Sequence, residues 1–289
     1  MTSQTTLIAG PTASGKSDHA LRLAETSPSV IINADALQVY DCWSILSARP
    51  QPSDLALADH RLYGHVKADC RYSVGAWLRD VAPILREAHT KDLSVIVVGG
   101  TGLYFDALTN GLAHVPEIKP EVRAASQALL NSNELHKMIA DLEASDPEIR
   151  FRIDTNNPMR VQRSWEVLTS TGRPLYKWQM EKTAPLVDGS SCEKTLINPP
   201  TEVLNERIEA RFRKMVELGA LEECRQFMNN GYDRNLPAAR ALGASQLISF
   251  LEGHVDLDKA IQDATIATRQ FAKRQRTWLR NRMSDWNKI

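Results

Sequence analysis

Residues 10–17 read GPTASGKS, which is the pattern G-x-x-x-x-G-K-S of a phosphate-binding loop. The apolar run at 7–9 precedes this loop, and a helix-like stretch, DHALRLAE, follows it. In a strand–loop–helix unit of this kind, loop amides and the helix N-terminus surround an anion, and the lysine adds a positive charge. The residues of the predicted phosphate or diphosphate site are Gly10, Pro11, Thr12, Ala13, Ser14, Gly15, Lys16 and Ser17.

Loops of this ATP-binding type usually serve nucleotide hydrolysis or phosphoryl transfer, with the Ser17 hydroxyl predicted to ligate magnesium. The GTPase patterns D-x-x-G and N-K-x-D do not occur in the sequence. The apolar run SVIVV at 94–98 ends in Gly-Gly-Thr, where an NTPase usually carries an acidic residue. A small-molecule kinase stays open, with Arg160 and Arg163 as an arginine lid over the phosphates.

The composition is that of a globular protein, with 289 residues of which 43% are hydrophobic and 24% charged. No apolar run approaches the roughly 18–20 residues that span a bilayer, and the N-terminus carries no secretory signal pattern. The four cysteines are scattered and form no C-x-x-C, which favours a reducing compartment over a disulfide or zinc framework. We expect a cytoplasmic protein without a membrane segment, and nothing demands more than a monomer.

Apolar runs at 6–9, 30–33, 94–98 and 195–198 are predicted strands, and helix-forming stretches lie between them. This order predicts an α/β fold, in which a mostly parallel sheet is flanked by helices around a P-loop-type core. The polar, strand-free stretch 114–190 is predicted to be a helical insertion. Residues 1–113 and 191–289 then form the core.

After residue 200 the chain is predicted to be wholly helical. One helix should present an apolar face, because apolar residues recur there at three- and four-residue steps. These are Leu204, Ile208, Phe212, Met215 and Leu218. The formal net charge is +0. Between residues 269 and 282, however, the last helical stretch carries basic residues and no acidic one. Such a local positive charge can bind a polyanion. This basic stripe consists of Arg269, Lys273, Arg274, Arg276, Arg280 and Arg282.

Two polar side chains follow predicted strands directly. Asp35 comes after the strand at 30–33, and Thr101 comes after the strand at 94–98. Ligands of open α/β sheets bind at the carboxyl ends of strands, so Asp35, Thr101 and Lys16 should converge on one crevice. A helix N-cap role for Asp35 and a turn role for Thr101 are the structural alternatives.

Five segments together resemble one family, the tRNA dimethylallyltransferases, or tRNA isopentenyltransferases. They are GPTASGKS, NAD-x-x-QVY, GGTGLYF-x-AL-x-x-GL, RIEARF-x-x-M and ATRQFAKRQ-x-TWLR, and they run from about residue 7 to about residue 282. The resemblance implies transfer of a dimethylallyl group from dimethylallyl diphosphate to N6 of adenine 37. That adenine lies beside the anticodon in tRNAs that read codons starting with U. The loop would then hold a leaving diphosphate instead of a phosphoryl donor.

The resemblance also implies catalytic roles. Asp35 matches the family's catalytic aspartate, which would accept the proton of the adenine amine. Lys16, the loop amides and magnesium on Ser17 would stabilise the departing diphosphate. Arg211 matches the arginine of the RIEARF segment, with Arg207 as a competitor one turn away, and Thr101 matches a threonine that contacts the target nucleotide.

The implied tRNA-binding positions fall into several segments, and the basic stripe adds two more positions from its charge. They are Asp35, Ala36, Leu37, Gln38, Thr101, Arg123, Met159, Arg160, Val161, Gln162, Arg163, Arg240, Lys273 and Arg274. The partner would be the anticodon stem-loop, from which adenine 37 must be splayed out.

The sequence departs from the family pattern in places. Ala36 stands where the family usually has Ser, the segment after Tyr40 is unusual, and Ala244 and Ser245 replace an aromatic residue and an arginine. For His60 we favour a structural role over catalysis. A non-catalytic tRNA-binding module is a third hypothesis, against which the intact Asp35 and phosphate loop argue.

Overall fold

The computed structural model of the chain describes residues 4–289. It divides into two compact units, which we describe separately. Unit 1 comprises Met1–Thr109 and Leu186–Ile289, and unit 2 comprises Asn110–Pro185.

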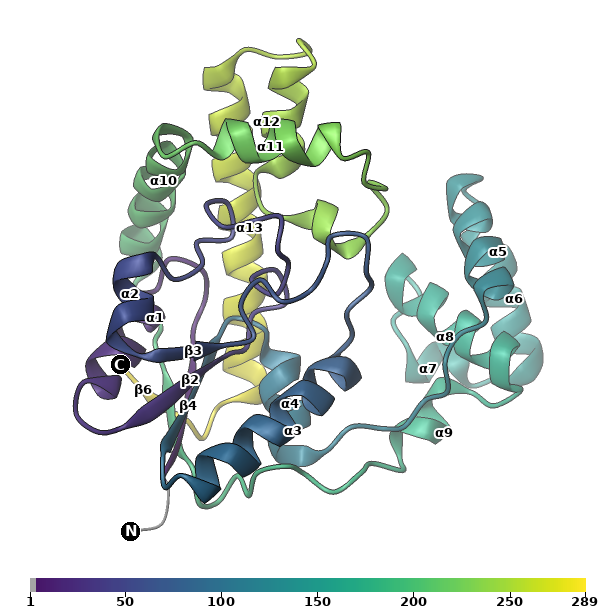
Figure 1. The fold of residues 1–289 in the computed structure, drawn as a ribbon. Helices are drawn as coiled ribbons and strands as arrows, with labels where there is room; N and C mark the ends of the chain where they lie inside the picture. The colour runs from purple at the N-terminus through teal and green to yellow at the C-terminus, as the bar shows by residue number, and fades with distance from the viewer. Residues whose placement is uncertain (1–3) are drawn as a thin grey trace. The chain divides into compact units, whose positions relative to one another are not determined.

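Unit 1 is built on a single parallel sheet with the strand order β3-β2-β4-β1-β5-β6 (Figure 1). The strands are β1 (Thr5–Ala9), β2 (Ser29–Asn33), β3 (Asp59–Arg61), β4 (Ser94–Gly99), β5 (Glu193–Leu196) and β6 (Asn287–Lys288). In the register, Ala9 pairs with Gly99, and Asn33 pairs with Val98. The carboxyl ends of β1, β2 and β4 therefore lie next to one another.

The two faces of the sheet follow the alternation of buried side chains along its strands. Ile8, Ile31 and Ile96 pack with Ala20 of α1 on one face. The other face packs with residues of α3, α4 and the long C-terminal helix α13. The helices that precede β5 in unit 1 are α1 (Lys16–Ala24), α2 (Pro52–Leu57), α3 (Val74–Thr90) and α4 (Gly102–Asn110). Strands covered on both faces explain the continuous β-branched runs.

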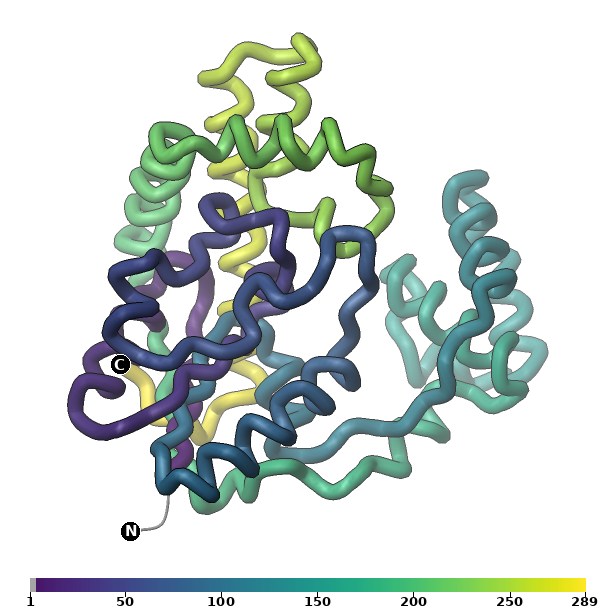
Figure 2. The backbone as a smooth tube through the Cα atoms, in the orientation of Figure 1, coloured from purple at the N-terminus to yellow at the C-terminus, as the bar shows by residue number. Residues whose placement is uncertain are grey.

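The helices after β5 form a second core of unit 1. They are α10 (Thr201–Glu217), α11 (Ala220–Asn229), the 3₁₀ helix η1 (Pro237–Arg240), α12 (Ala244–Leu251) and α13 (Leu257–Arg282). Helix α13, drawn in yellow, reaches from α12 to the sheet core, where Leu279 is buried (Figure 2). One helix thus connects the helical core with the sheet.

Unit 2 is helical. Its helices are α5 (Pro120–Asn131), α6 (Leu135–Ser145), α7 (Ile149–Arg152), α8 (Pro158–Thr171) and α9 (Leu175–Gln179). They enclose their own apolar core, in which Met138 and Val161 are 0% exposed. Inside this unit the Ser126 hydroxyl donates to Glu166 at 2.7 Å and accepts from Gln162 at 3.0 Å.

The predicted fold class is confirmed, since the sheet is parallel and flanked by helices. Three details of the prediction were wrong. Strands β3 and β6 were not anticipated, and β6 contradicts a wholly helical end of the chain. Both are short edge strands held by main-chain pairing, which leaves no periodic pattern in the sequence. Leu218 is 57% exposed, because α10 ends at Glu217.

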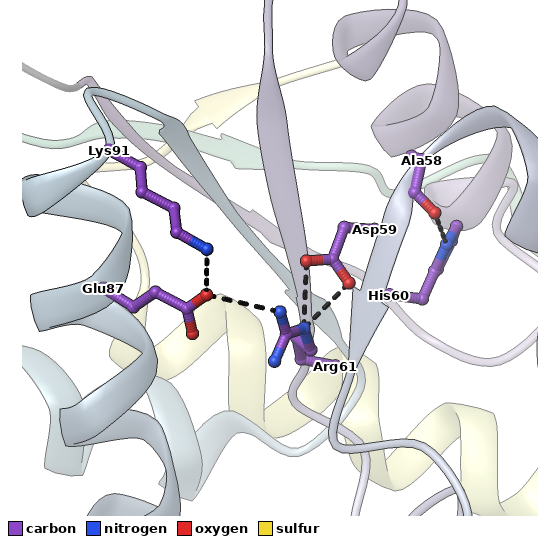
Figure 3. Close-up of polar contacts among 6 residues, drawn as sticks. All are labelled: Ala58, Asp59, His60, Arg61, Glu87 and Lys91. Carbon is purple, nitrogen blue, oxygen red and sulfur yellow. Dashed lines mark hydrogen bonds and ion pairs between the residues drawn. The ribbon is translucent and has the colours of Figure 1, made fainter.

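Side chains fix strand β3 at the edge of the sheet. The Arg61 guanidinium contacts the Asp59 carboxylate and the Glu87 carboxylate of α3, which also accepts from Lys91 (Figure 3). His60 turns the other way, and its Nδ1 lies 2.9 Å from the Ala58 carbonyl oxygen. A local backbone contact of this kind is consistent with a structural role for His60.

In the part of the chain that the structure describes, no helix is long and apolar enough to cross a membrane.

Gly99 offers a test of how tightly the strand ends are packed. A Cβ atom at Gly99 would lie 2.1 Å from the Ala34 carbonyl oxygen. Gly99→Ala should therefore lower the free energy of unfolding by about 1–3 kcal/mol, the usual penalty of overpacking. Urea denaturation measures it, with Gly189→Ala as the control, because a Cβ there meets nothing closer than Thr109 at 3.3 Å. Equal unfolding free energies in the two variants would contradict this packing.

Candidate active site

The phosphate loop connects β1 to α1 and takes the conformation that its glycines allow. Gly15 has φ 91° at the N-terminus of α1, a left-handed value that favours glycine. A Cβ atom at Gly10 would lie 2.6 Å from the Ser14 hydroxyl oxygen and 2.8 Å from the Ile197 carbonyl oxygen. The Ser14 hydroxyl is buried without a hydrogen-bond partner. The tight turn therefore leaves this hydroxyl free within an anion-binding geometry.

Lys16 and Arg211 bring two positive charges to the loop. The Lys16 ammonium donates to the Pro11 carbonyl at 3.2 Å. Burial lowers the pKa of Lys16 to about 8, the Asp35 carboxylate opposes this, and Arg211 adds to the lowering. Burial also lowers the pKa of Arg211, against the pull of Asp35 and Asp18. The opposed effects show that both cations feel the Asp35 charge, and a bound anion would relieve their mutual repulsion.

Asp35 is held rigidly just past the end of β2. Asn33, which is 0% exposed, accepts from the Asp35 amide at 2.9 Å and donates to the Asp35 carbonyl at 3.1 Å. The Asp35 Oδ1 atom accepts from the Leu37 amide at 3.0 Å. Its Oδ2 atom lies 3.3 Å from the place of a Cβ on Gly100. One carboxylate oxygen therefore braces the turn, and the other faces the tip of β4.

Thr101 joins the tips of β2 and β4. Its hydroxyl accepts from the Ala36 amide at 2.9 Å, and its own amide donates to the Ala34 carbonyl at 3.1 Å. These bonds leave the hydroxyl hydrogen of Thr101 available to an acceptor. The tips of β2 and β4 thus lie together, whereas the predicted convergence of Lys16 with them on one crevice stays a prediction.

Two cavities meet at Asp35. The first, which we call the loop cavity, is bordered by Thr12, Ala13, Asp35, Leu46, Arg211 and Phe212. The second, the tip cavity, is bordered by Asp35, Ala36, Thr101, Arg240, Arg274 and Trp278. Asp35, Leu37 and Phe271 border both. A ligand in either cavity would therefore lie against the same carboxylate.

A third cavity borders the end of the phosphate loop and the start of α1. We call it the outer cavity, and it is bordered by Ser17, Asp18, His60, Tyr63 and Arg211. Within residues 4–289, no cluster of three or more histidine, cysteine, aspartate or glutamate side chains forms a ready-made metal site. Mg²⁺ beside phosphates usually needs only one or two protein ligands. The Ser17 hydroxyl and the Asp18 carboxylate therefore fit such an ion.

Arg207 lies at the loop as well. Its guanidinium donates to the Ser14 carbonyl at 3.3 Å and lies 3.8 Å from the place of a Cβ on Gly15. Arg211, in contrast, borders both the loop cavity and the outer cavity. Arg207 thus braces the outside of the loop, whereas Arg211 is directed to the ligand space.

Gln38, a predicted tRNA-contacting residue, is largely committed to the protein. Its side-chain nitrogen donates to the carbonyls of Ser47 at 3.0 Å and Ala48 at 2.9 Å. Only the amide oxygen of Gln38 remains for a ligand. The residue fixes the segment that carries Leu46 into the loop cavity.

In unit 2 the predicted segment 159–163 divides into two kinds of residue. Val161 and Gln162 are buried, at 0% and 8% exposure, so their side chains pack inside this unit and do not form an RNA-binding surface. This part of the prediction was wrong because the helical period turns those positions inward. Met159, Arg160 and Arg163 are exposed, and the Arg123 charge lies near enough to act on Arg163.

The basic stripe is likewise divided. Arg269 donates to Glu209 at 2.9 Å, and Arg276 donates to Asn198 at 3.0 Å and to Thr201. These two arginines stabilise the fold around α13. Lys273 and Arg274 are exposed, and Arg274 borders the tip cavity.

Sequence reasoning missed two residues of α13 at the site. Trp278 packs so closely on α4 that a Cβ at Gly102 would lie 2.0 Å from its ring. Gln275 is 8% exposed, and its amide bonds to both Thr12 and Gly100. The sequence signal for Gln275 is its helical spacing, which places this polar residue in the same buried row as Thr268, Ala272 and Leu279.

Family models match two stretches of the chain. Residues 38–282 match the family described as IPP transferase, and residues 3–66 match Isopentenyl transferase. The tRNA dimethylallyltransferase of Cereibacter sphaeroides is 53% identical over 283 residues, which cover 98% of this chain and 88% of that relative. The protein of the same name from Dinoroseobacter shibae is 52% identical over 286 residues, or 99% of this chain and 94% of the relative.

Solved structures of similar fold come from the same kind of enzyme as these relatives. The full-length tRNA isopentenylpyrophosphate transferase of Bacillus halodurans aligns with a TM-score of 0.70 and 27% identity, over 99% of this chain and 89% of that chain. A eukaryotic dimethylallyltransferase acting on tRNA shares the fold with a TM-score of 0.79 at 24% identity, over 96% of this chain and 70% of that chain. The resemblance drawn from five sequence segments is thereby confirmed, and the chain belongs to the IPP transferase family.

Proposed function

We propose that the protein transfers a dimethylallyl group from dimethylallyl diphosphate to N6 of adenine 37 in tRNAs that read codons starting with U. The products are N6-(dimethylallyl)adenosine and diphosphate, and the reaction takes place in the cytoplasm. The observation that carries this proposal is the position of Asp35 on the border of both the loop cavity and the tip cavity. A donor held by the phosphate loop and a base at the strand tips would meet at this carboxylate.

The donor's diphosphate belongs at the phosphate loop. Negative charge develops on it as the allylic carbon–oxygen bond breaks, and preorganised donors stabilise that charge where it forms. Lys16 supplies a point charge, Arg211 a forked guanidinium, and the loop its backbone amides. Ser17 would hold Mg²⁺, which supplies further neutralisation of the leaving diphosphate when bound.

The adenine belongs in the tip cavity. Its exocyclic amine is a weak nucleophile because the lone pair is delocalised, so removal of its proton assists attack. The new bond joins N6 to the allylic carbon, the carbon–oxygen bond breaks, and Asp35 takes the N6 proton. The Thr101 hydroxyl, with a free hydrogen beside Asp35, would orient the base.

Apolar walls protect the allylic group from water. Leu46, Phe212 and Phe271 border the loop cavity together with the charged groups. A cationic allylic fragment exposed to solvent would be hydrolysed, so a closed apolar wall favours transfer to the amine.

Exposed cations supply the contacts to tRNA. In unit 1 these are Arg240, Lys273 and Arg274, and in unit 2 they are Arg160 and Arg163, with the exposed Met159 and the half-buried Arg123 as further contacts. Phosphate contacts of this kind offset the few kcal/mol required to unstack the adenine. The protein acts as a monomer in this proposal, because every group assigned to the chemistry lies in one chain.

The kinase alternative is not supported. The tip of β4 carries Gly99, Gly100 and Thr101 in place of an acidic residue. The relatives at half identity are named tRNA dimethylallyltransferases.

One assay tests the function. The protein is incubated with dimethylallyl diphosphate, magnesium and an anticodon stem-loop that contains A36-A37-A38, and the RNA is weighed by mass spectrometry. We expect the gain of one C5 unit on adenine 37. Unmodified RNA, with ATP-dependent phosphorylation of a small molecule instead, would overturn the proposal in favour of a kinase.

Asp35→Asn tests the role of the carboxylate. The amide keeps the shape and still accepts from Leu37, but it cannot take a proton, so kcat should fall about 10²-fold or more. The stem-loop affinity should change less than threefold in a filter-binding assay. Asp69→Asn, on an exposed loop, is the control and should keep full activity. Undiminished turnover in Asp35→Asn would remove Asp35 from its role.

Two arginine variants separate Arg211 from Arg207. Arg211→Lys should lower kcat/KM for dimethylallyl diphosphate about 10-fold or more, since lysine cannot bind an oxyanion in a forked geometry. Arg207→Lys should have a smaller effect, because that side chain contacts the Ser14 carbonyl of the loop and does not border the loop cavity. Steady-state kinetics at saturating stem-loop measure both, and the reverse order would contradict the assignment.

Charge removal on α13 tests the tRNA contacts. The double variant Lys273→Gln, Arg274→Gln should weaken stem-loop binding and reduce the slope of log K against log salt by about one for each lost phosphate contact. Lys214→Gln, an exposed lysine on α10 paired with Glu217, is the matched control. A salt slope equal to that of the wild type would show that these two charges are merely solvated.

A further inference from the structure

Gln275 connects two parts of the active site through one side chain. Its Oε1 atom accepts from the Thr12 amide of the phosphate loop at 2.9 Å. Its Nε2 atom donates to the Gly100 carbonyl at the tip of β4, also at 2.9 Å. The side chain is 8% exposed and projects from α13.

The fit around this side chain is close. A Cβ atom at Gly100 would lie 2.3 Å from the Gln275 Nε2 atom and 3.3 Å from the Asp35 Oδ2 atom. Gly100 therefore has the Gln275 amide and the Asp35 carboxylate as direct neighbours. Gly100 also precedes Thr101, whose hydroxyl holds the Ala36 amide. A shift of Gln275 would be felt by both strand tips.

At neutral pH a primary amide can make this pair of contacts from one terminal group, because it carries an acceptor and a donor side by side, whereas an ionised carboxylate only accepts. Placing it in the buried row of α13 is unfavourable unless both atoms are paired. In the structure both are paired, and with two backbone groups that belong to different strand ends. If this position of α13 only had to be filled, methionine or leucine would fill it without the need for hydrogen bonds.

We propose that Gln275 is a positioning residue for the prenyl transfer: it ties the phosphate loop to the tip of β4 and so fixes the distance between the donor diphosphate and the Asp35–Thr101 pair. This inference rests on the proposed function of the site. The Thr12 amide is bound to Gln275, and the Ser14 amide donates to the Pro11 carbonyl, so the diphosphate would be bound by the amides at the end of the loop, from Gly15 to Ser17. The tie also makes α13, which carries Lys273 and Arg274, a direct support of the phosphate loop.

The tie predicts a particular pattern of kinetic effects. A loosened loop binds the diphosphate less well, and a shifted β4 tip misplaces Asp35 and Thr101. The KM for dimethylallyl diphosphate should therefore rise and kcat should fall. Gln275 also borders the tip cavity, where the adenine is proposed to bind. The KM for the stem-loop should nevertheless rise less than the KM for the donor, because the exposed cations that contact the RNA backbone are unchanged.

Three variants test this pattern. Gln275→Met keeps the length of the side chain and removes both hydrogen bonds. Gln275→Glu keeps the acceptor for Thr12, but its carboxylate cannot donate to the Gly100 carbonyl. Gln270→Met, the same substitution at an exposed glutamine of α13, is the matched control. Thermal unfolding of each variant reports the folded fraction.

For Gln275→Met we expect kcat/KM for dimethylallyl diphosphate to fall about 10- to 100-fold, which two lost hydrogen bonds account for. For Gln275→Glu, kcat/KM relative to the wild type should rise toward one as the pH is lowered from about 8 to about 6. A protonated carboxyl group again offers one donor and one acceptor, and burial raises the pKa of a carboxyl group into this range. Gln275→Met should show no recovery.

Two results would overturn the inference. One is a folded Gln275→Met variant with both kinetic constants for the donor within twofold of the wild type. The other is a Gln275→Met variant that only loses active protein, with the KM values for donor and stem-loop unchanged, together with a Gln275→Glu variant whose kcat/KM does not rise at low pH. That result would mark Gln275 as a purely structural residue. Inactive wild-type protein would instead count against the proposed function, so the two failures are distinguishable.

Discussion

The negative charge of Asp35, which borders the loop cavity together with Arg211, acts on both Lys16 and Arg211. Burial lowers the pKa of each cation, and the carboxylate opposes that lowering. A diphosphate at the loop would strengthen the charged form of both cations and leave Asp35 facing the second cavity. This single electrostatic arrangement separates a leaving-group side from a nucleophile side, and the proposed chemistry depends on it.

Side-chain hydrogen bonds hold the loop and the strand ends of this site in place. Asn33 fixes the turn that carries Asp35, and Thr101 ties the tip of β2 to the tip of β4. Gln275 ties that tip to the phosphate loop. These are hydrogen bonds to backbone groups, so they hold the strand ends themselves in place. The parallel sheet supplies adjacent carboxyl ends, and this network sets their separation.

Much of this was predictable from the sequence. The loop pattern, the β-branched runs and the residues directly after them are local signals, and they predicted the parallel sheet and the adjacent positions of Asp35 and Thr101 at its strand ends. What was missed depends on contacts between distant segments. The donation from Gln38 to the carbonyls of Ser47 and Ala48 leaves no local pattern, and neither does the pairing of Gln275 with Thr12. The inward position of Val161 follows from helical phase, which motif matching ignores.

A crystal structure of the protein with a non-reactive thiolo analogue of dimethylallyl diphosphate and an anticodon stem-loop tests the central claim most directly. The account predicts that the diphosphate binds to amides of the phosphate loop. It also predicts that N6 of the extruded adenine lies between an Asp35 carboxylate oxygen, at about 3 Å, and the allylic carbon of the analogue. An adenine bound with its amine away from Asp35, or an analogue bound outside the loop, would contradict it.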